Sequence, residues 1–263
     1  MSTFKKVLAS VGIGAAKVDT YSYTTDTMPG ATLKGEVYVI GGDVAQNIEQ
    51  IYFYVATKYK RESRNSSFHS YEECKLLKHQ VTQRFAIKSK EEKIIPVSIE
   101  VEVPCRTPLT LGQQEVYIRT GLDIGMAVNP KDWDYISVQP HPLMKRVLTA
   151  LELLGFYLYE ANCKHNVYLG RNYPFVQELE FRPRGKYQRL LDELEVIFYL
   201  EPNLLEMLLK IDRRARNLAG LVEEALDADE SYARLYVSST DLNQPLQNLM
   251  NKIETVIQRY IND

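Results

Sequence analysis

Residues 29–43 read PGATLKGEVYVIGGD, and this stretch decides the fold class. Pro29-Gly30 predicts a turn, because proline presets φ at the first central position and glycine accepts the positive φ that follows. After the turn, small or apolar residues alternate with polar ones, the period of a strand with one buried face, at Leu33, Gly35, Val37 and Val39. Gly41-Gly42 then reverses the chain toward a second apolar run at residues 51–56. The stretch therefore predicts an antiparallel β-hairpin.

More short strands are predicted in the first half of the chain. Residues 95–104, IPVSIEVEVP, alternate apolar and polar side chains between two prolines, and residues 115–124 follow the same period. Many short strands with turns between them and almost no helical period predict an antiparallel β-sandwich over residues 18–128. Before it, residues 1–17 carry apolar side chains on one helical face and predict a short amphipathic helix rather than an export signal.

A boundary between two domains is expected at residues 129–142. This segment holds three prolines and little periodicity, which favours a semi-rigid hinge over a floppy tether. The single tryptophan, Trp133, lies here beside Asp134 and Tyr135. We expect these three residues to form the seam between the two lobes.

The second domain is predicted to span residues 143–238. Residues 143–154 have the spacing of a helix that ends at Gly155. Strand-like runs follow at residues 156–159, 173–181, 194–200, 204–211 and 232–237, with a helical stretch at residues 217–228. The pattern is typical of a mostly β domain with helical insertions.

Residues 239–263 are expected to contain a C-terminal amphipathic helix. Its apolar residues recur at alternating spacings of three and four, which is a heptad seam, at Leu246, Leu249, Ile253, Val256 and Tyr260. Fewer than three heptads cannot hold a coiled coil alone. The helix therefore either packs on its own domain or joins a partner helix, which would give a homodimer.

Composition excludes several classes of function. The formal net charge is −2, so no long-range positive field exists to hold nucleic acid. The three cysteines are an odd number without paired spacing, which favours a reducing cytosol over a disulfide framework. No apolar run reaches the roughly 20 residues of a membrane span, so no integral membrane segment is expected. These features predict a cytoplasmic protein.

Metal-binding and catalytic motifs are weak throughout the sequence. His69, Cys74 and His79 are spaced by five, a poor spacing for ligands on one strand or helix, and Cys163 and His165 form a second candidate. The acidic run at residues 227–230 lacks the glycine and the distal glutamate of a calcium loop. Nucleophile-elbow and phosphate-loop motifs are missing from the sequence as well. We therefore expect no catalytic residue, no metal and no cofactor.

One basic cluster could hold a phosphate or an acidic partner. It comprises Arg213, Arg214 and Arg216. The alternative is a solvated surface cluster that acidic residues nearby balance, which is the commoner outcome for such charges.

Several blocks of the chain resemble known proteins. The order Pro-Gly-x-x-Leu-x-Gly-x-Val-x-Val with a Gly-Gly turn resembles the opening hairpin of arrestin-like domains. Further blocks resemble the bacterial sporulation-control protein M family: FKK at residues 4–6, ASVGIGAA at 9–16, GLDI at 121–124, DWDYI at 132–136, PFVQE at 174–178, LDELE at 191–195 and DRR at 212–214. The resemblance extends to about residue 237. It implies a mainly β fold of two arrestin-like antiparallel β-sandwich lobes, and regulation of spore development or cell-cycle events through protein contacts.

Three hypotheses about function follow. The first is a non-enzymatic cytosolic regulator or adaptor that binds other proteins, for instance through an exposed sheet edge. The alternative is a structural scaffold that self-assembles through the heptad seam at residues 246–260. An unrecognised hydrolase or metal enzyme, resting on His69, Cys74 and His79, is the third.

Overall fold

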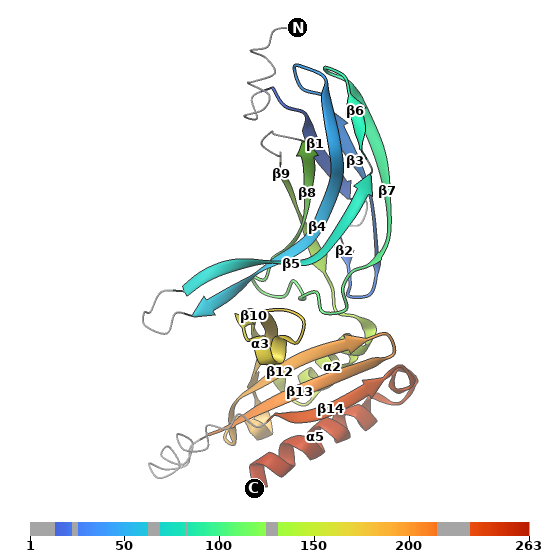
Figure 1. Ribbon diagram of the computed structural model, residues 1–263. Coiled ribbons are helices and arrows are strands. Elements are labelled where there is room, and N and C mark those ends of the chain that lie inside the picture. Colours follow the sequence, from blue (N-terminus) through green and yellow to red (C-terminus); the bar gives the residue numbers. More distant parts are fainter. Residues whose placement is uncertain are drawn as a thin grey trace. The chain divides into compact units, whose positions relative to one another are not determined.

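The chain divides into two compact, mainly β units. A computed structural model (Figure 1) describes residues 14–22, 26–62, 69–82, 84–124, 131–214 and 232–262. The first unit comprises Met1–Lys58, Tyr71–Thr110 and Glu115–Gln139, and the second comprises Tyr59–Ser70, Leu111–Gln114 and Pro140–Asp263. The predicted mainly β fold is confirmed. Most of the N-terminal helix expected at residues 1–17, and the helix expected at 217–228, lie outside the described residues.

The first unit is built from two sheets. The smaller sheet is antiparallel, in the order β1 (Lys17–Ser22), β3 (Thr32–Ile40) and β7 (Glu92–Glu102). The larger sheet centres on β4 (Gln46–Glu62), which pairs on one side with β5 (His69–Thr82) and β6 (Phe85–Ile87). On its other side follow β8 (Val116–Ile124), β9 (Lys131–Val138) and β2 (Asp26–Thr27). Because β1 also contacts β8 and β9, the two sheets pack face to face as a sandwich.

The predicted hairpin is present with the expected burial. Leu33, Val37 and Val39 of β3 are at most 1% exposed, and Gly35 is buried with them. The alternating residues Lys34, Glu36 and Tyr38 are exposed or half-buried. Gly30 adopts a φ of +83°, and its N–H donates to the carbonyl of Val103 at 2.8 Å. Gly41-Gly42 ends β3 for a different reason, which is close backbone approach. A Cβ on Gly42 would lie 1.9 Å from the carbonyl oxygen of Gly14.

We predict that Gly42→Ala destabilises the first unit strongly. The added methyl would meet backbone atoms that cannot rotate away, so the free energy of unfolding should fall by about 3 kcal/mol or more. Gly30→Ala is the matched control in the same unit, because a Cβ there meets nothing within 4 Å and only its φ of +83° is strained. That strain should cost about 1–2 kcal/mol. Urea unfolding measures both variants, and equal losses would contradict the prediction.

The second unit has one antiparallel sheet and two main helices. The strand order is β10 (Phe156–His165), β11 (Phe175–Pro183), β12 (Leu191–Glu201), β13 (Leu204–Arg213) and β14 (Ala233–Ser238). Helices α2 (Pro142–Leu153) and α5 (Leu246–Asn262) contact each other and β13 (Figure 1). The shorter elements are α3 (Val167–Gly170), η1 (Gly185–Tyr187) and η2 (Ser239–Asn243).

The core of this unit joins one face of the sheet to the helices. Val196 pairs with Leu209 across β12 and β13, and both side chains are fully buried. Fully buried residues also lie on both helices, among them Val147 of α2 and Ile253 of α5. Where we expected a second β-sandwich, the described strands of this unit form a single sheet, and helices supply the layer that a second sheet would provide.

The hinge predicted at residues 129–142 is corrected in part. Residues 131–138 form β9, which pairs with β8 inside the first unit. Within β9, Ile136 and Val138 are buried, so this short apolar step belongs to the sheet. Pro142 starts α2, with His141 as its N-cap, because a first-turn proline needs no N–H partner. The prolines therefore bracket ordered elements, and the change of unit falls after Gln139.

Candidate protein-interaction surface

A group of tyrosines lies on the outward face of the larger sheet of the first unit. In β4, the side chains of Ile51, Phe53 and Val55 are at most 1% exposed. Because strand side chains alternate between faces, Tyr52 and Tyr54 lie on the opposite side of the sheet. Tyr54 pairs with Arg119 of β8, and Tyr117 pairs with Tyr135 of β9. We call this surface the tyrosine face: Tyr52, Tyr54 and Tyr135, with Glu73, Lys75, Lys78 and Arg119. Tyr117 is fully buried and supports this face through its contacts with Glu73 and Tyr135.

Aromatic and charged contacts order the tyrosine face. The rings of Tyr52 and Tyr54 meet edge to face with centroids 5.1 Å apart. The ammonium of Lys75 lies 4.4 Å from the centroid of Tyr54, and that of Lys78 lies 4.6 Å from the centroid of Tyr52. Such cation–π contacts contribute about 0.5–1 kcal/mol at exposed sites. They hold the two lysines over the rings while leaving their positive charge exposed to solvent.

Glu73 of β5 organises the other end of this face. Its carboxylate accepts a hydrogen bond from the hydroxyl of Tyr117 at 2.8 Å, and it pairs with the guanidinium of Arg119 at 3.0 Å. Within the described residues, no ion pair joins Lys75 or Lys78 to a carboxylate. Among the side chains that define this face there are three cations and one anion, so this set carries net positive charge.

Tyr54 and Tyr117 stay neutral at physiological pH. Burial, and then a hydrogen bond with Tyr52, raises the pKa of Tyr54 to about 12. Burial and the hydrogen bond to Glu73 raise the pKa of Tyr117 as well. Tyr135 is 60% exposed, so part of this aromatic surface is open to a partner. Tyrosine and arginine are among the residues that contribute most binding energy at protein interfaces.

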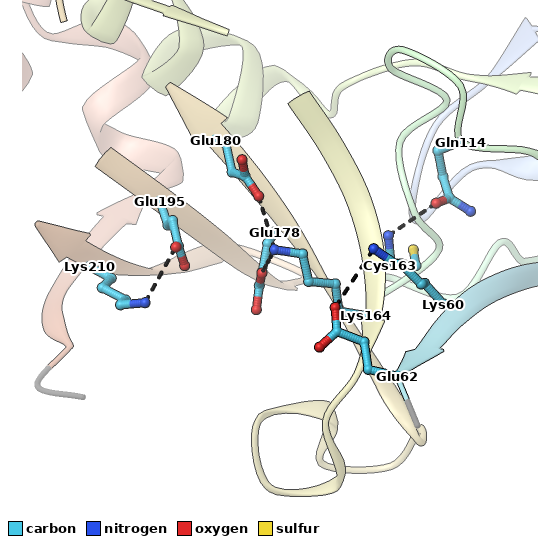
Figure 2. A network of polar contacts seen from close by, with 9 residues as sticks. All are labelled: Lys60, Glu62, Gln114, Cys163, Lys164, Glu178, Glu180, Glu195 and Lys210. Atoms are coloured by element: carbon cyan, nitrogen blue, oxygen red, sulfur yellow. Dashed lines mark hydrogen bonds and ion pairs between the residues drawn. The ribbon is translucent and has the colours of Figure 1, made fainter. Parts of the chain in front are cut away.

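A second set of polar contacts spans the sheet of the other unit (Figure 2). Lys164 of β10 lies between two carboxylates of β11, at 2.8 Å from Glu178 and 2.9 Å from Glu180. Glu195 of β12 pairs with Lys210 of β13 at 3.3 Å. Burial alone would lower the pKa of Lys164, but its hydrogen bonds to the two glutamates raise it above the usual range. These lysines therefore stabilise carboxylates that the fold has partly removed from water.

One cluster of three acidic residues in this unit was not predicted from the sequence motifs. Glu193 and Glu195 of β12 and Asp212 of β13 bring their carboxylate oxygens within 4.8 Å of one another. Oxygen donors of this type suit Ca²⁺ or Mg²⁺. The group was missed because its members come from two paired strands, not from one local motif; Glu193 pairs directly with Asp212. Burial, and then repulsion by Asp212, raises the pKa of Glu193.

We predict that Glu193→Gln stabilises the protein at neutral pH. Folding raises the pKa of this carboxyl, so the folded state binds more protons than the unfolded chain between the two pKa values. The free energy of unfolding therefore falls as pH rises through that window, and the variant escapes this loss. Urea unfolding should show a more stable variant at about pH 7 and no difference at about pH 3.5, where both states are protonated.

Glu254→Gln provides the control of opposite sign. Hydrogen bonds from Lys186 and Tyr187 lower the pKa of Glu254 in the folded state. This carboxylate therefore contributes stability above its ordinary pKa, and its removal should cost stability at about pH 7. Equal effects of the two substitutions at neutral pH would contradict this account.

The predicted heptad seam packs largely on its own unit. Leu249 is 3% exposed and Ile253 is fully buried, while Leu246, Val256 and Tyr260 are half-buried. The fully buried position in the following turn is Ile257, one residue after the predicted Val256. A helix packed on α2 and β13 buries a stripe with a period near 3.6, which drifts from a strict heptad. Of the two alternatives for this helix, the structure has packing on its own domain.

We predict that Ile257→Ala costs about 2–5 kcal/mol of unfolding free energy, because it opens a cavity in a filled core. Val256→Ala is the neighbouring control and should cost much less, since this side chain is already half exposed to solvent. Thermal or urea unfolding checks both substitutions. A larger loss for Val256→Ala would mean that the heptad seam, and not the 3.6-residue stripe, carries the packing.

The remaining predicted residues are dispersed. Trp133, Asp134 and Tyr135 lie in β9 of the first unit. Arg213 is exposed at the end of β13, Arg214 pairs with Asp192 at 2.8 Å, and Arg216 lies outside the described residues. The basic cluster is thus balanced in part by an acidic neighbour.

The histidines and cysteines considered as metal ligands also make separate contacts. The ring of His79 packs 5.5 Å from that of Phe53, and that of His165 lies 6.0 Å from Tyr59. Cys74 and Cys163 are buried and form no disulfide. In the described ranges, the acidic group of β12 and β13 is the one set of three such side chains close enough to share a metal ion. None of the helices in those ranges is long and apolar enough to cross a membrane.

Comparison with known proteins gives a consistent result. The family described as SpoOM protein matches residues 4–215. The sporulation-control protein spo0M of Bacillus subtilis (strain 168) is 40% identical over 267 residues, which cover 99% of each chain. The crystal structure of Spo0M, a sporulation control protein from Bacillus subtilis, superposes with a TM-score of 0.83 and 34% identity, covering 94% of this chain and 100% of that one. The chain belongs to the SpoOM protein family.

Proposed function

We propose that this protein is a non-enzymatic regulator of sporulation that acts by binding other proteins in the cytoplasm. The observation that carries the proposal is the 40% identity to a sporulation-control protein along 99% of both chains. A likeness of that extent runs along the whole length of both units. The three cysteines form no disulfide and two of them are buried, which is compatible with a reducing compartment.

The tyrosine face supports binding as the mode of action. It joins rigid aromatic side chains to lysines that are held over the rings and remain exposed. Tyrosines lose little conformational entropy on binding, so such a surface is largely pre-organised for a partner. Exposed lysines beside it attract carboxylates of the partner and speed the encounter.

We predict that this protein can functionally replace the Bacillus subtilis sporulation-control protein in living cells. Expressed in Bacillus subtilis that lacks the relative, the wild-type chain should restore the count of heat-resistant spores. The double variant Lys75→Glu/Lys78→Glu should restore it poorly, because it reverses the charge of the tyrosine face. The control Lys88→Glu/Lys145→Glu makes the same charge change at two exposed lysines that are not part of this face and should behave as wild type.

Two outcomes would overturn the proposal. Failure of the wild-type chain, at a protein level equal to that of the relative, would remove the sporulation role. Full activity of Lys75→Glu/Lys78→Glu would remove the tyrosine face as the binding surface. A photo-crosslinking residue at Tyr135 gives an independent readout, because a bound protein should then appear as a covalent adduct that the double variant loses.

A further inference from the structure

The start of β10 exposes side chains on both faces of the strand. Tyr157, Leu158 and Tyr159 are 39%, 40% and 59% exposed, and Glu160 is exposed as well. A strand with one covered face would bury every second residue. Leu153, at the end of α2, is 62% exposed and lies just before this segment in the chain. We call residues Phe156–Glu160 the β10 edge.

The β10 edge also lacks a strand partner on one side. β10 pairs with β11 along its whole length, from Phe156 opposite Pro183 to His165 opposite Phe175. On its other side, the recorded pairing within the described residues is a single position, Lys164 opposite Lys60 of β4. The open side of the β10 edge therefore presents backbone N–H and C=O groups that another strand can use.

Two arginines of known orientation flank this edge. The guanidinium of Arg182 lies 3.7 Å from the ring centroid of Tyr159, and that of Arg184 lies 4.2 Å from the centroid of Tyr157. Both side chains are exposed, and in the described part of the chain neither forms an ion pair. The neighbouring acid Glu180 is already bound to Lys164. The edge therefore carries two cations whose charge is not neutralised locally.

We infer that the β10 edge binds an extended acidic segment of a partner protein by strand addition, with carboxylates of that segment on Arg182 and Arg184. The inference rests on the proposed function, since it names the chemistry of a protein partner. An added strand alternates its side chains between two faces. Those on the face of Tyr157 meet the arginines, because Tyr157 pairs with Arg182, and those on the other face meet Leu158. The recognised pattern is therefore acidic and apolar residues in alternation.

A β-bulge limits how far the added strand extends. The register between β10 and β11 shifts between Leu158 and Glu160, which leaves Tyr159 without an opposite residue. Bulges of this kind end regular pairing and protect an open edge from uncontrolled addition. Glu160, just beyond the bulge, repels a second acidic group there. The partner is thus bound over a short stretch of the strand.

The experiment uses the full chain and defined peptides as probes. A fluorescein-labelled ten-residue peptide of alternating Val and Asp is titrated by fluorescence anisotropy. A Val and Lys peptide reverses its charge, and a third peptide with Pro in place of alternate Val residues removes backbone donors. We expect binding of the first peptide alone, with slower hydrogen exchange at residues 156–160 in the complex.

Variants of the chain test the side chains. Arg182→Glu/Arg184→Glu should weaken binding of the acidic peptide about tenfold or more, because it places like charges in contact. Arg189→Glu/Lys145→Glu makes the same change at two exposed cations of the same unit and should bind as wild type. Circular dichroism confirms that both variants fold, since all four side chains are exposed.

Several results would overturn the inference. They are no binding of the acidic peptide, equal binding of the lysine or proline peptide, or unchanged affinity in Arg182→Glu/Arg184→Glu. If light scattering shows that this variant changes the mass of the protein alone, the edge belongs to a second copy of the chain and the inference also fails. If the wild-type chain restores sporulation but does not bind the acidic peptide, the inference about the β10 edge is wrong and the proposed function stands. If the chain binds the peptide but does not restore sporulation, the proposed function is wrong and binding at the edge stands.

Discussion

The carbonyl of Gly14 lies so close to Gly42 that no side chain fits between them. The same carbonyl accepts a hydrogen bond from the N–H of Asp43 at 2.8 Å, which ties the start of the chain to the turn between β3 and β4. This contact sets where β1 runs beside β3, with Lys17 opposite Ile40, and where β4 begins. The register of the first unit depends on it. A slip of one residue would exchange buried and outward faces along a whole strand.

A shift in β4 completes this arrangement. Ile48 pairs with Ile124 and Gln50 with Asp123, so Glu49 is an extra residue in the ladder. After it, the odd-numbered residues Ile51, Phe53 and Val55 point into the core. The tyrosine face therefore exists because a bulge places Tyr52 and Tyr54 outward, beside Arg119. The position of this candidate surface therefore depends on which residues of β4 point away from the core.

The sequence predicts the individual strands and helices well, but it does not predict which of them lie next to one another. Alternation in residues 33–39 and helical spacing in residues 143–154 are local, so both elements were predicted close to their observed bounds. The tyrosine face and the acidic group of β12 and β13 join residues that are distant in sequence. Strand pairing brings these residues together, and the register of that pairing cannot be read from a single sequence. The error at Val256 has another cause, since spacings of three and four fit a heptad and a 3.6-residue stripe almost equally over four turns.

The tyrosine face and the β10 edge share one structural feature, although they lie in different units. In both, a cation lies over a tyrosine ring and forms no ion pair within the described residues: Lys75 and Lys78 in the first unit, Arg182 and Arg184 in the second. A carboxylate in that place would neutralise the charge, whereas a ring restrains the side chain and leaves its charge available. Restraint before binding reduces the entropy lost when a partner arrives. On the proposed function, these two surfaces attract acidic segments of a partner, in a chain whose formal net charge is −2.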